Sequence, residues 1–159
     1  MRRIEYPVLT DILGGDATAS DDGIRVRHAH APEPTDLAEL IHSDWPAFRR
    51  TRTVLVETGA ADESDPDIEA LNRLVAHGVR VIGAGPRPLR SPAPLAFLYE
   101  RDFPRAAVAS IYALSAGQTI ILITRTDDSI RRLHPLLAHA FSWRRAWREF
   151  EARDRAEIP

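Results

Sequence analysis

The residues of this chain best suited to chemistry are two closely spaced histidines, His28 and His30. They follow the run IRVR at residues 24–27, whose alternation of apolar and basic residues predicts a half-exposed strand. Side chains two positions apart on a strand share a face, so the two imidazoles could bind one zinc ion together. A zinc site needs further ligands, and the alternative is the polar end of a strand that Pro32 and Pro34 terminate.

A second group of candidates is an acidic loop, residues 57–69, which holds six acidic residues and no basic one. It follows a predicted buried strand, and open α/β sheets bind ligands beyond the carboxyl ends of their strands. Carboxylates are ligands for divalent cations, so Asp62 and Asp65 could complete a metal site with the two histidines. The alternative is that Asp65 and Asp67 only cap the next helix and complement its dipole.

The third group combines large aromatic residues with arginines near the end of the chain: Trp143, Arg144, Trp147, Arg148 and Phe150. Tryptophan and arginine are enriched at protein interfaces, and together they can also stack on nucleic-acid bases. Besides a protein interface and a nucleic-acid interface, the alternative is a helix whose aromatic side chains enter the core while its arginines face water. A helix of about 25 residues spans roughly 37 Å, more than a domain of this size covers, so we expect part of the stripe to be an exposed interface.

Composition removes several classes of chemistry. The 159-residue chain has no cysteine, which excludes a thiolate nucleophile and cysteine-based zinc sites. All 21 basic residues are arginine, so no lysine is present for a Schiff base or a phosphate-binding loop. The net charge of −2 does not favour a nucleic-acid partner. No apolar run is long enough for a membrane span. We expect a cytoplasmic protein, and we expect it to have no cofactor.

The pattern of apolar residues predicts a single α/β domain over residues 1–159, with a mixed sheet of about six strands. A β-branched run at 53–56, a helix of about a dozen residues ending at Gly78 and a strand at 79–82 form a right-handed parallel βαβ unit. The residues expected to be most buried are Val54, Leu55, Val56, Ile82, Ile121 and Ile123.

The second half is predicted to continue as an antiparallel meander and then a long helix. Residues 95–99, 106–112 and 119–124 are strand candidates, and short turns between them favour antiparallel neighbours. A helix is expected from residue 127 to about 153, with a restart at Pro135. Outside these elements, we expect residues 1–22 to form an N-terminal arm and residues 154–159 a frayed tail.

The order of these elements resembles the phospholipase-D-like effector domain of actinobacterial transcriptional regulators. The resemblance is carried by HGVRVIGAGP, LAFLYERDFPRAAVASI and GQTIILITRTDDSIRRLHPLLAHAFSWRRAW, within residues 53–150. Arg101-Asp102 and Arg105-Ala106 match the family's turn, and Leu137, Phe141, Trp143 and Trp147 approximate its helical stripe. The family's catalytic motif needs a lysine, which this chain lacks, and no helix-turn-helix is evident. The resemblance therefore implies a non-catalytic sensing or assembly module.

Two functions follow from the sequence. The first is a non-enzymatic regulatory or assembly module that acts through a protein partner or as a homodimer, with the aromatic stripe as its interface. The second is a metal-dependent hydrolase or nuclease that uses His28, His30 and the acidic loop 57–69. We favour the first, because no catalytic residue set can be identified from the spacing of serines, histidines and acids.

Overall fold

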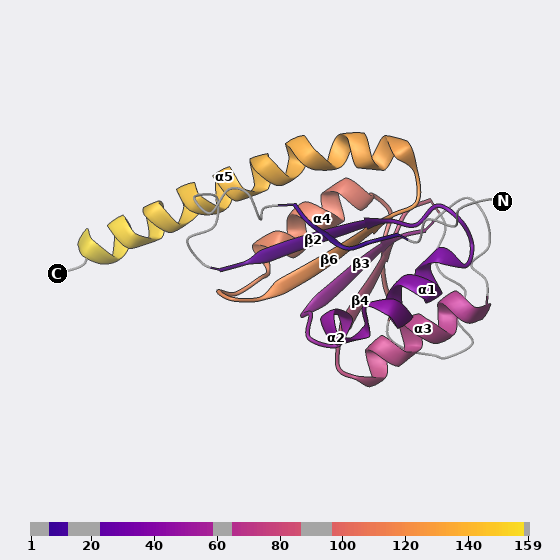
Figure 1. Cartoon of the computed structure of the whole chain (residues 1–159). Helices are drawn as coiled ribbons and strands as arrows, with labels where there is room; N and C mark the ends of the chain where they lie inside the picture. The colour runs from indigo at the N-terminus through magenta and orange to yellow at the C-terminus, as the bar shows by residue number, and fades with distance from the viewer. Residues whose placement is uncertain (1–6, 13–22, 59–64, 87–96, 158–159) are drawn as a thin grey trace.

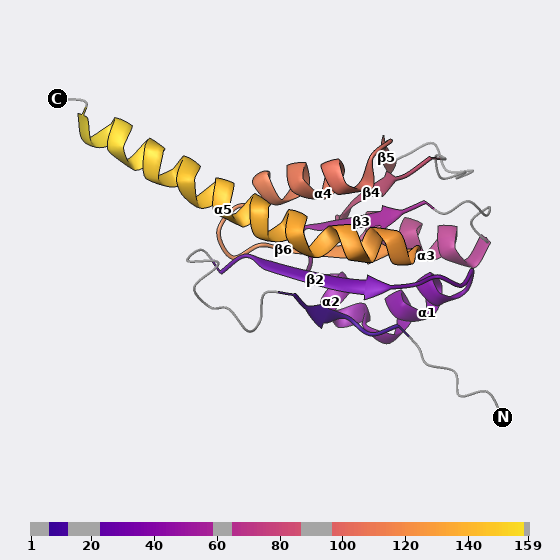
Figure 2. The ribbon, with the colours of Figure 1, turned by 90° about the horizontal axis from the view of Figure 1, so that it is seen from above.

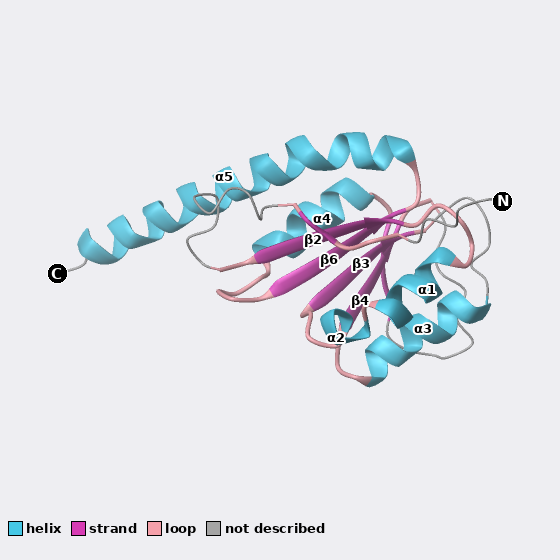
Figure 3. Cartoon of the chain, viewed as in Figure 1, coloured by secondary structure: helices cyan, strands magenta, loops and turns pink. Residues whose placement is uncertain are grey.

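A six-stranded sheet with helices on both faces forms the body of the protein (Figures 1 and 3). The computed structural model describes residues 7–12, 23–58, 65–86 and 97–157. The strands are β1 (Thr10–Asp11), β2 (Arg25–His30), β3 (Thr53–Glu57), β4 (Arg80–Ala84), β5 (Phe97–Glu100) and β6 (Thr119–Thr124). The helices are α1 (Asp36–Ser43), α2 (Trp45–Phe48), α3 (Asp65–Ala76), α4 (Phe103–Tyr112) and α5 (Asp127–Glu157).

The strands lie in the spatial order β1-β2-β6-β3-β4-β5. Neighbours from β2 to β5 are all parallel, and only the two-residue β1 pairs antiparallel, with β2 at the sheet edge. The prediction of an α/β domain with a mixed sheet of about six strands and a long C-terminal helix is therefore confirmed. Of the predicted N-terminal arm, only residues 7–12 are described, and they include this edge strand.

The sheet separates two apolar cores. Helices α1, α2 and α3 cover one face, where Leu40 and Leu71 pack with alternate residues of the strands, such as Val54. Helices α4 and α5 cover the other face, where Ile111 and Leu137 pack against strand residues of the opposite parity. Figure 2, seen from above, shows α4 and α5 side by side over the strands. The alternation arises because successive side chains of a strand point to opposite faces.

The predicted parallel βαβ unit is present as β3, α3 and β4, with Leu55 opposite Ile82. Helix α3 ends at Ala76, and Gly78 follows it as the expected C-terminal cap. The φ of Gly78 is 83°, a backbone conformation that residues with a Cβ rarely adopt. All six residues predicted to form the centre of the core are buried, none more than 6% exposed: Val54, Leu55, Val56, Ile82, Ile121 and Ile123.

The predicted antiparallel meander is wrong, because residues 103–112 form helix α4 rather than a strand. The Asp102 carboxylate accepts a hydrogen bond from the Arg105 N–H and caps the helix, and Pro104 lies in its first turn. The buried residues recur at helical spacing: Phe103, Ala106, Ala107, Ser110 and Ile111. With a helix between them, β5 and β6 lie at separate places in the parallel sheet.

Helix α5 is 31 residues long and continues through Pro135, so the predicted restart is wrong. Pro135 is exposed, and the carbonyl left without its N–H partner can face water. The helix also extends to Glu157, into the segment expected to fray. At 1.5 Å per residue it is about 46 Å long, and Figures 1 and 2 show its C-terminal part projecting beyond the sheet. None of the described helices combines the length and apolarity needed to cross a membrane.

The two-sided burial of the sheet leads to a stability prediction for Leu55, which is fully buried at the centre of β3. Leu55→Ala is expected to lower the free energy of unfolding by about 2–5 kcal/mol, because it removes buried apolar contacts and leaves a cavity. Val8→Ala is the matched control, because Val8 is 69% exposed and its truncation should change stability by less than about 0.5 kcal/mol. Urea denaturation followed by circular dichroism measures both, and equal midpoints would contradict the packing described here.

Candidate functional site

The carboxyl ends of β2, β6 and β3 form the topological switch point of the sheet. The chain leaves β2 and β3 for helices on one face, whereas it leaves β6 for α5 on the other face. In open α/β sheets this arrangement creates a crevice in which ligands bind. Here polar side chains of the chain itself lie at this edge. Their contacts with one another determine which groups could still bind a ligand.

The Glu57 carboxylate binds donors directly before α5 and in its first turn. Its Oε2 accepts hydrogen bonds from the N–H groups of Arg125, at 2.6 Å, and Thr126, at 3.2 Å. Its Oε1 accepts from the hydroxyl groups of Thr126 and Ser129. The α5 dipole favours negative charge near the start of the helix, and one buried carboxylate binds two backbone N–H groups and two hydroxyl groups there. Glu57 therefore fixes the start of α5 to the end of a central strand.

Arg125 forms a second buried link, between β6 and the helices on the opposite face from α5. Its guanidinium donates to the carbonyl oxygens of Ala31 and Glu33, and it lies 3.3 Å from the Asp67 carboxylate. Asp67 is fully buried and also accepts a hydrogen bond from the Ala38 N–H in the first turn of α1. The sequence analysis considered Asp67 as a cap of its own helix, whereas the helix whose N–H it accepts is α1.

The two histidines share a face of β2, as the strand pattern predicts, and both contact Thr124 on β6. His28 Nε2 lies 2.9 Å and His30 Nδ1 3.3 Å from the threonine hydroxyl, and His30 Nε2 lies 3.3 Å from an Asp127 carboxylate oxygen. Of the other two ligands of the hypothetical metal site, Asp62 lies outside the described residues, and the side chain of Asp65 is not described. Among the residues that the structure does describe, no three histidines or carboxylates are grouped to hold a metal ion.

Arg144 binds α5 to the C-terminal end of α4. Its guanidinium donates to the carbonyl oxygens of Ile111, at 3.1 Å, Tyr112, at 3.2 Å, and Leu114, at 2.6 Å. These carbonyls form the negative end of the α4 dipole, which favours a cation. Burial lowers the pKa of the Arg144 guanidinium from its usual value, because desolvation disfavours the charged form. Although Arg144 was predicted at the interface, its charged group faces α4 rather than the outside.

The aromatic residues predicted at the interface are exposed in the chain as described. Trp143 and Trp147 are each 58% exposed, and Phe150 is 61% exposed. The Trp147 and Phe150 rings lie 5.8 Å apart, and Trp147 Nε1 donates to the Glu151 carboxylate at 2.9 Å. The side chain of Arg148, the remaining member of the predicted set, is not described. Exposed apolar patches of this kind mark interaction sites, so we define Trp143, Trp147 and Phe150 as the aromatic stripe.

Sequence reasoning missed the roles of three residues, namely Glu57, Arg125 and Arg144. Each acts through partners 30 or more positions away along the chain, so no local spacing indicates them. A signal was available for Glu57, because it is a charged residue that directly continues a buried apolar strand. Such a charge has to be paired or bound to helix donors.

Comparisons with known proteins support the fold alone. No protein-family model matches the chain, and no curated protein matches its sequence. Among solved structures, the chain is similar to a domain from a Haemophilus ducreyi protein assigned as a UDP-N-acetylmuramate:L-alanyl-gamma-D-glutamyl-meso-diaminopimelate ligase. The TM-score is 0.51 with 17% identity, over 76% of this chain and 93% of that one.

This similarity corrects the resemblance drawn from the order of elements. The fold resembles the ligase domain, not a phospholipase-D-like effector domain. The resemblance relied on a strand at 106–112 after the Arg105-Ala106 turn, and these residues belong to α4. The stripe positions compared with that family divide between two roles, since Leu137 and Phe141 are buried whereas both tryptophans are exposed.

The contacts of Glu57 predict a specific effect on stability. Glu57→Gln is expected to cost about 1–3 kcal/mol, because a neutral amide accepts fewer hydrogen bonds and leaves donors at the start of α5 unpaired. Glu149→Gln on the exposed surface of the same helix is the matched control and should change stability by less than about 0.5 kcal/mol. Chemical denaturation of both variants provides the comparison, and equal losses would show that the cap does not stabilise the domain.

Proposed function

We propose that this protein is a non-enzymatic assembly module that pairs with a second copy of itself through the aromatic stripe of α5. The observation that carries the proposal is the exposure of three large aromatic side chains on a helix that projects beyond the sheet. Tryptophan and phenylalanine are costly to leave in water, and aromatic residues are enriched where proteins bind one another.

The spacing of the stripe suits pairing with another helix. Trp143, Trp147 and Phe150 are separated by four and then three positions, which is the repeat of the apolar seam in a coiled coil. Upstream, Leu136 and Ala140 continue the same repeat, and Ala140 is buried within the domain. The seam therefore passes from the core of one copy to a surface that a second helix can cover.

The charges on the face of the stripe favour an antiparallel partner of the same sequence. Glu151 and Asp154 follow Trp147 by four and seven positions, so they share its face of the helix, and both are exposed. A parallel pair would place these carboxylates beside the same carboxylates of the other copy, which is destabilising, whereas an antiparallel pair that crosses at Trp147 separates them.

Sedimentation tests the pairing. The wild-type chain is expected to sediment as a dimer at tens of micromolar, and Trp147→Glu as a monomer, because the substitution removes an aromatic ring and buries a carboxylate in the seam. The matched control is Ala152→Glu, which adds the same carboxylate at an exposed position on the side of α5 away from the stripe.

The control variant is expected to remain a dimer. A wild-type chain that sediments as a monomer would refute self-pairing, as would a dimer that Trp147→Glu leaves intact. Circular dichroism of each variant verifies that α5 remains helical, so a change in mass can be assigned to the surface.

A further inference from the structure

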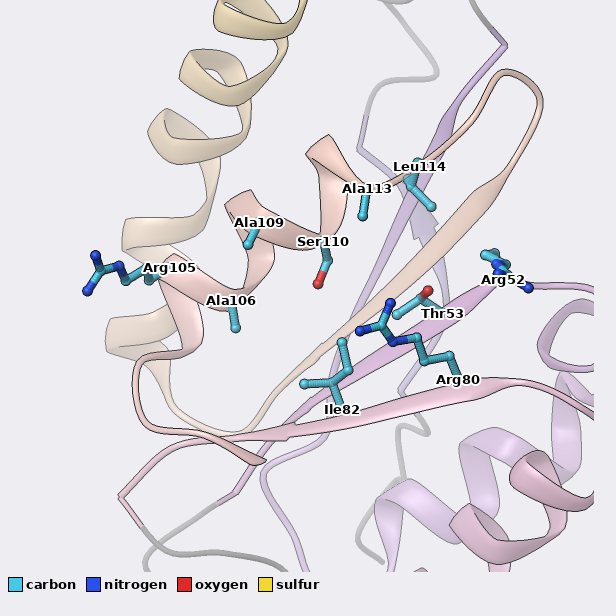
Figure 4. Close-up of a pocket in the computed structure, with 10 residues that line it drawn as sticks. All are labelled: Arg52, Thr53, Arg80, Ile82, Arg105, Ala106, Ala109, Ser110, Ala113 and Leu114. Carbon is cyan, nitrogen blue, oxygen red and sulfur yellow. The ribbon is translucent and has the colours of Figure 1, made fainter. Parts of the chain in front are cut away.

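A pocket of about 280 Å³ lies between α4 and the amino ends of β3 and β4, at the opposite end of the strands from Glu57 (Figure 4). Its wall on α4 is made by small side chains one helical turn apart, Ala106, Ser110 and Ala113, which leave the space open. The facing wall includes Thr53 on β3 and Ile82 on β4.

The charge of this pocket is entirely positive. Its lining residues include three arginines, Arg52, Arg80 and Arg105, and no acidic residue. Arg80 begins β4 directly opposite Thr53, and its N–H donates to the carbonyl oxygen of Arg52, so two of the guanidinium groups belong to adjacent strand ends. Within the part of the chain that the structure describes, neither Arg52 nor Arg80 has an ion pair with a carboxylate.

Two of these arginines point in different directions. Arg80 extends its guanidinium into the space between the sheet and α4, toward Thr53 and the Ser110 hydroxyl, whereas Arg105 points away from the pocket (Figure 4). The negative end of α4 near Ala113 does not cancel this positive charge, because Arg144 already binds the Ile111, Tyr112 and Leu114 carbonyls. An anion that enters the pocket would therefore meet the Arg80 guanidinium and the Thr53 and Ser110 hydroxyl groups.

We propose that this pocket binds a small organic phosphate, with the phosphoryl group held by Arg80 together with the Thr53 and Ser110 hydroxyl groups. A guanidinium group binds phosphate oxygens through paired, charge-assisted hydrogen bonds, and the charges of Arg52 and Arg105 at the edge of the pocket add to its attraction for an anion. The alanines and Ile82 offer an apolar surface to the carbon portion of the ligand. The volume lies at the low end of ligand pockets, which favours a monoester with a few carbons over a dinucleotide.

Binding is tested with glycerol 3-phosphate and inorganic phosphate as probes and glycerol as the uncharged comparison. Titrations of the ¹⁵N-labelled full chain are expected to shift the amide resonances of Thr53, Arg80 and Ser110 with both phosphates, more tightly with the ester, and not with glycerol. Arg80→Gln should weaken binding of the ester by about tenfold or more, because it removes one charge-assisted pair.

Arg105→Gln is the matched control, since it removes the same charge beside the pocket from a side chain that points away. It is expected to bind within about twofold of the wild type. Equal weakening in both variants would show that the phosphate is attracted only by overall charge and would overturn the proposal. So would the absence of shifts at these three residues, or equal affinity for inorganic phosphate and the ester, which would remove the role of the apolar wall. Because Arg80 and Arg105 are both exposed, either change should leave the fold intact, as circular dichroism can verify.

Discussion

The carboxylate of Glu57 is the interaction on which the arrangement of the long helix depends. It lies at the end of a central strand and accepts hydrogen bonds from the backbone and hydroxyl groups of the residues directly before α5. A buried carboxylate is costly unless several donors surround it, and the start of a helix provides such donors in one place. The strand and the helix therefore fix one another at the edge where open α/β sheets bind ligands.

Arg144 supplies the second fixed point of α5, about seventeen residues after its start, on the carbonyl groups that end α4. Between the two points the helix covers the sheet through Leu133, Leu137 and Ala140. Beyond the second point no part of the sheet lies beneath it, and its aromatic residues become exposed (Figure 1). Exposure of the stripe thus follows from the length of a helix that is held at two defined places. The length and attachment of α5 therefore explain why the surface proposed for pairing is exposed.

The sequence predicts those elements whose buried residues recur with a local period. It does not predict contacts between residues that are distant along the chain. The β-branched run at 53–56 and the helix ending at Gly78 were predictable because apolar spacing and a glycine cap are local signals. Helix α4 is not predicted, because its alanine-rich run between two short connections also fits a strand, and Asp102-Phe103-Pro104 fits a turn as well as a helix cap. The buried polar contacts and the arginine pocket were not predictable, since they join residues from separate strands and helices.

We propose that two copies of α5 cross antiparallel about Trp147, and one distance tests this arrangement. The chain contains no cysteine, so Ala138→Cys on the exposed side of α5 accepts a single spin label in each copy. An antiparallel pair centred on Trp147 places the two labelled positions about 27 Å apart along the helix axis. Ala138 lies on the side of α5 away from Trp147, so the interhelical separation of about 10 Å and both label arms add to this axial offset, and dipolar spectroscopy should give a distance well above about 27 Å. A parallel pair has no axial offset, so the distance between its labels would be set by the interhelical separation and the label arms alone. That shorter distance, or no dipolar coupling at all, would contradict antiparallel pairing.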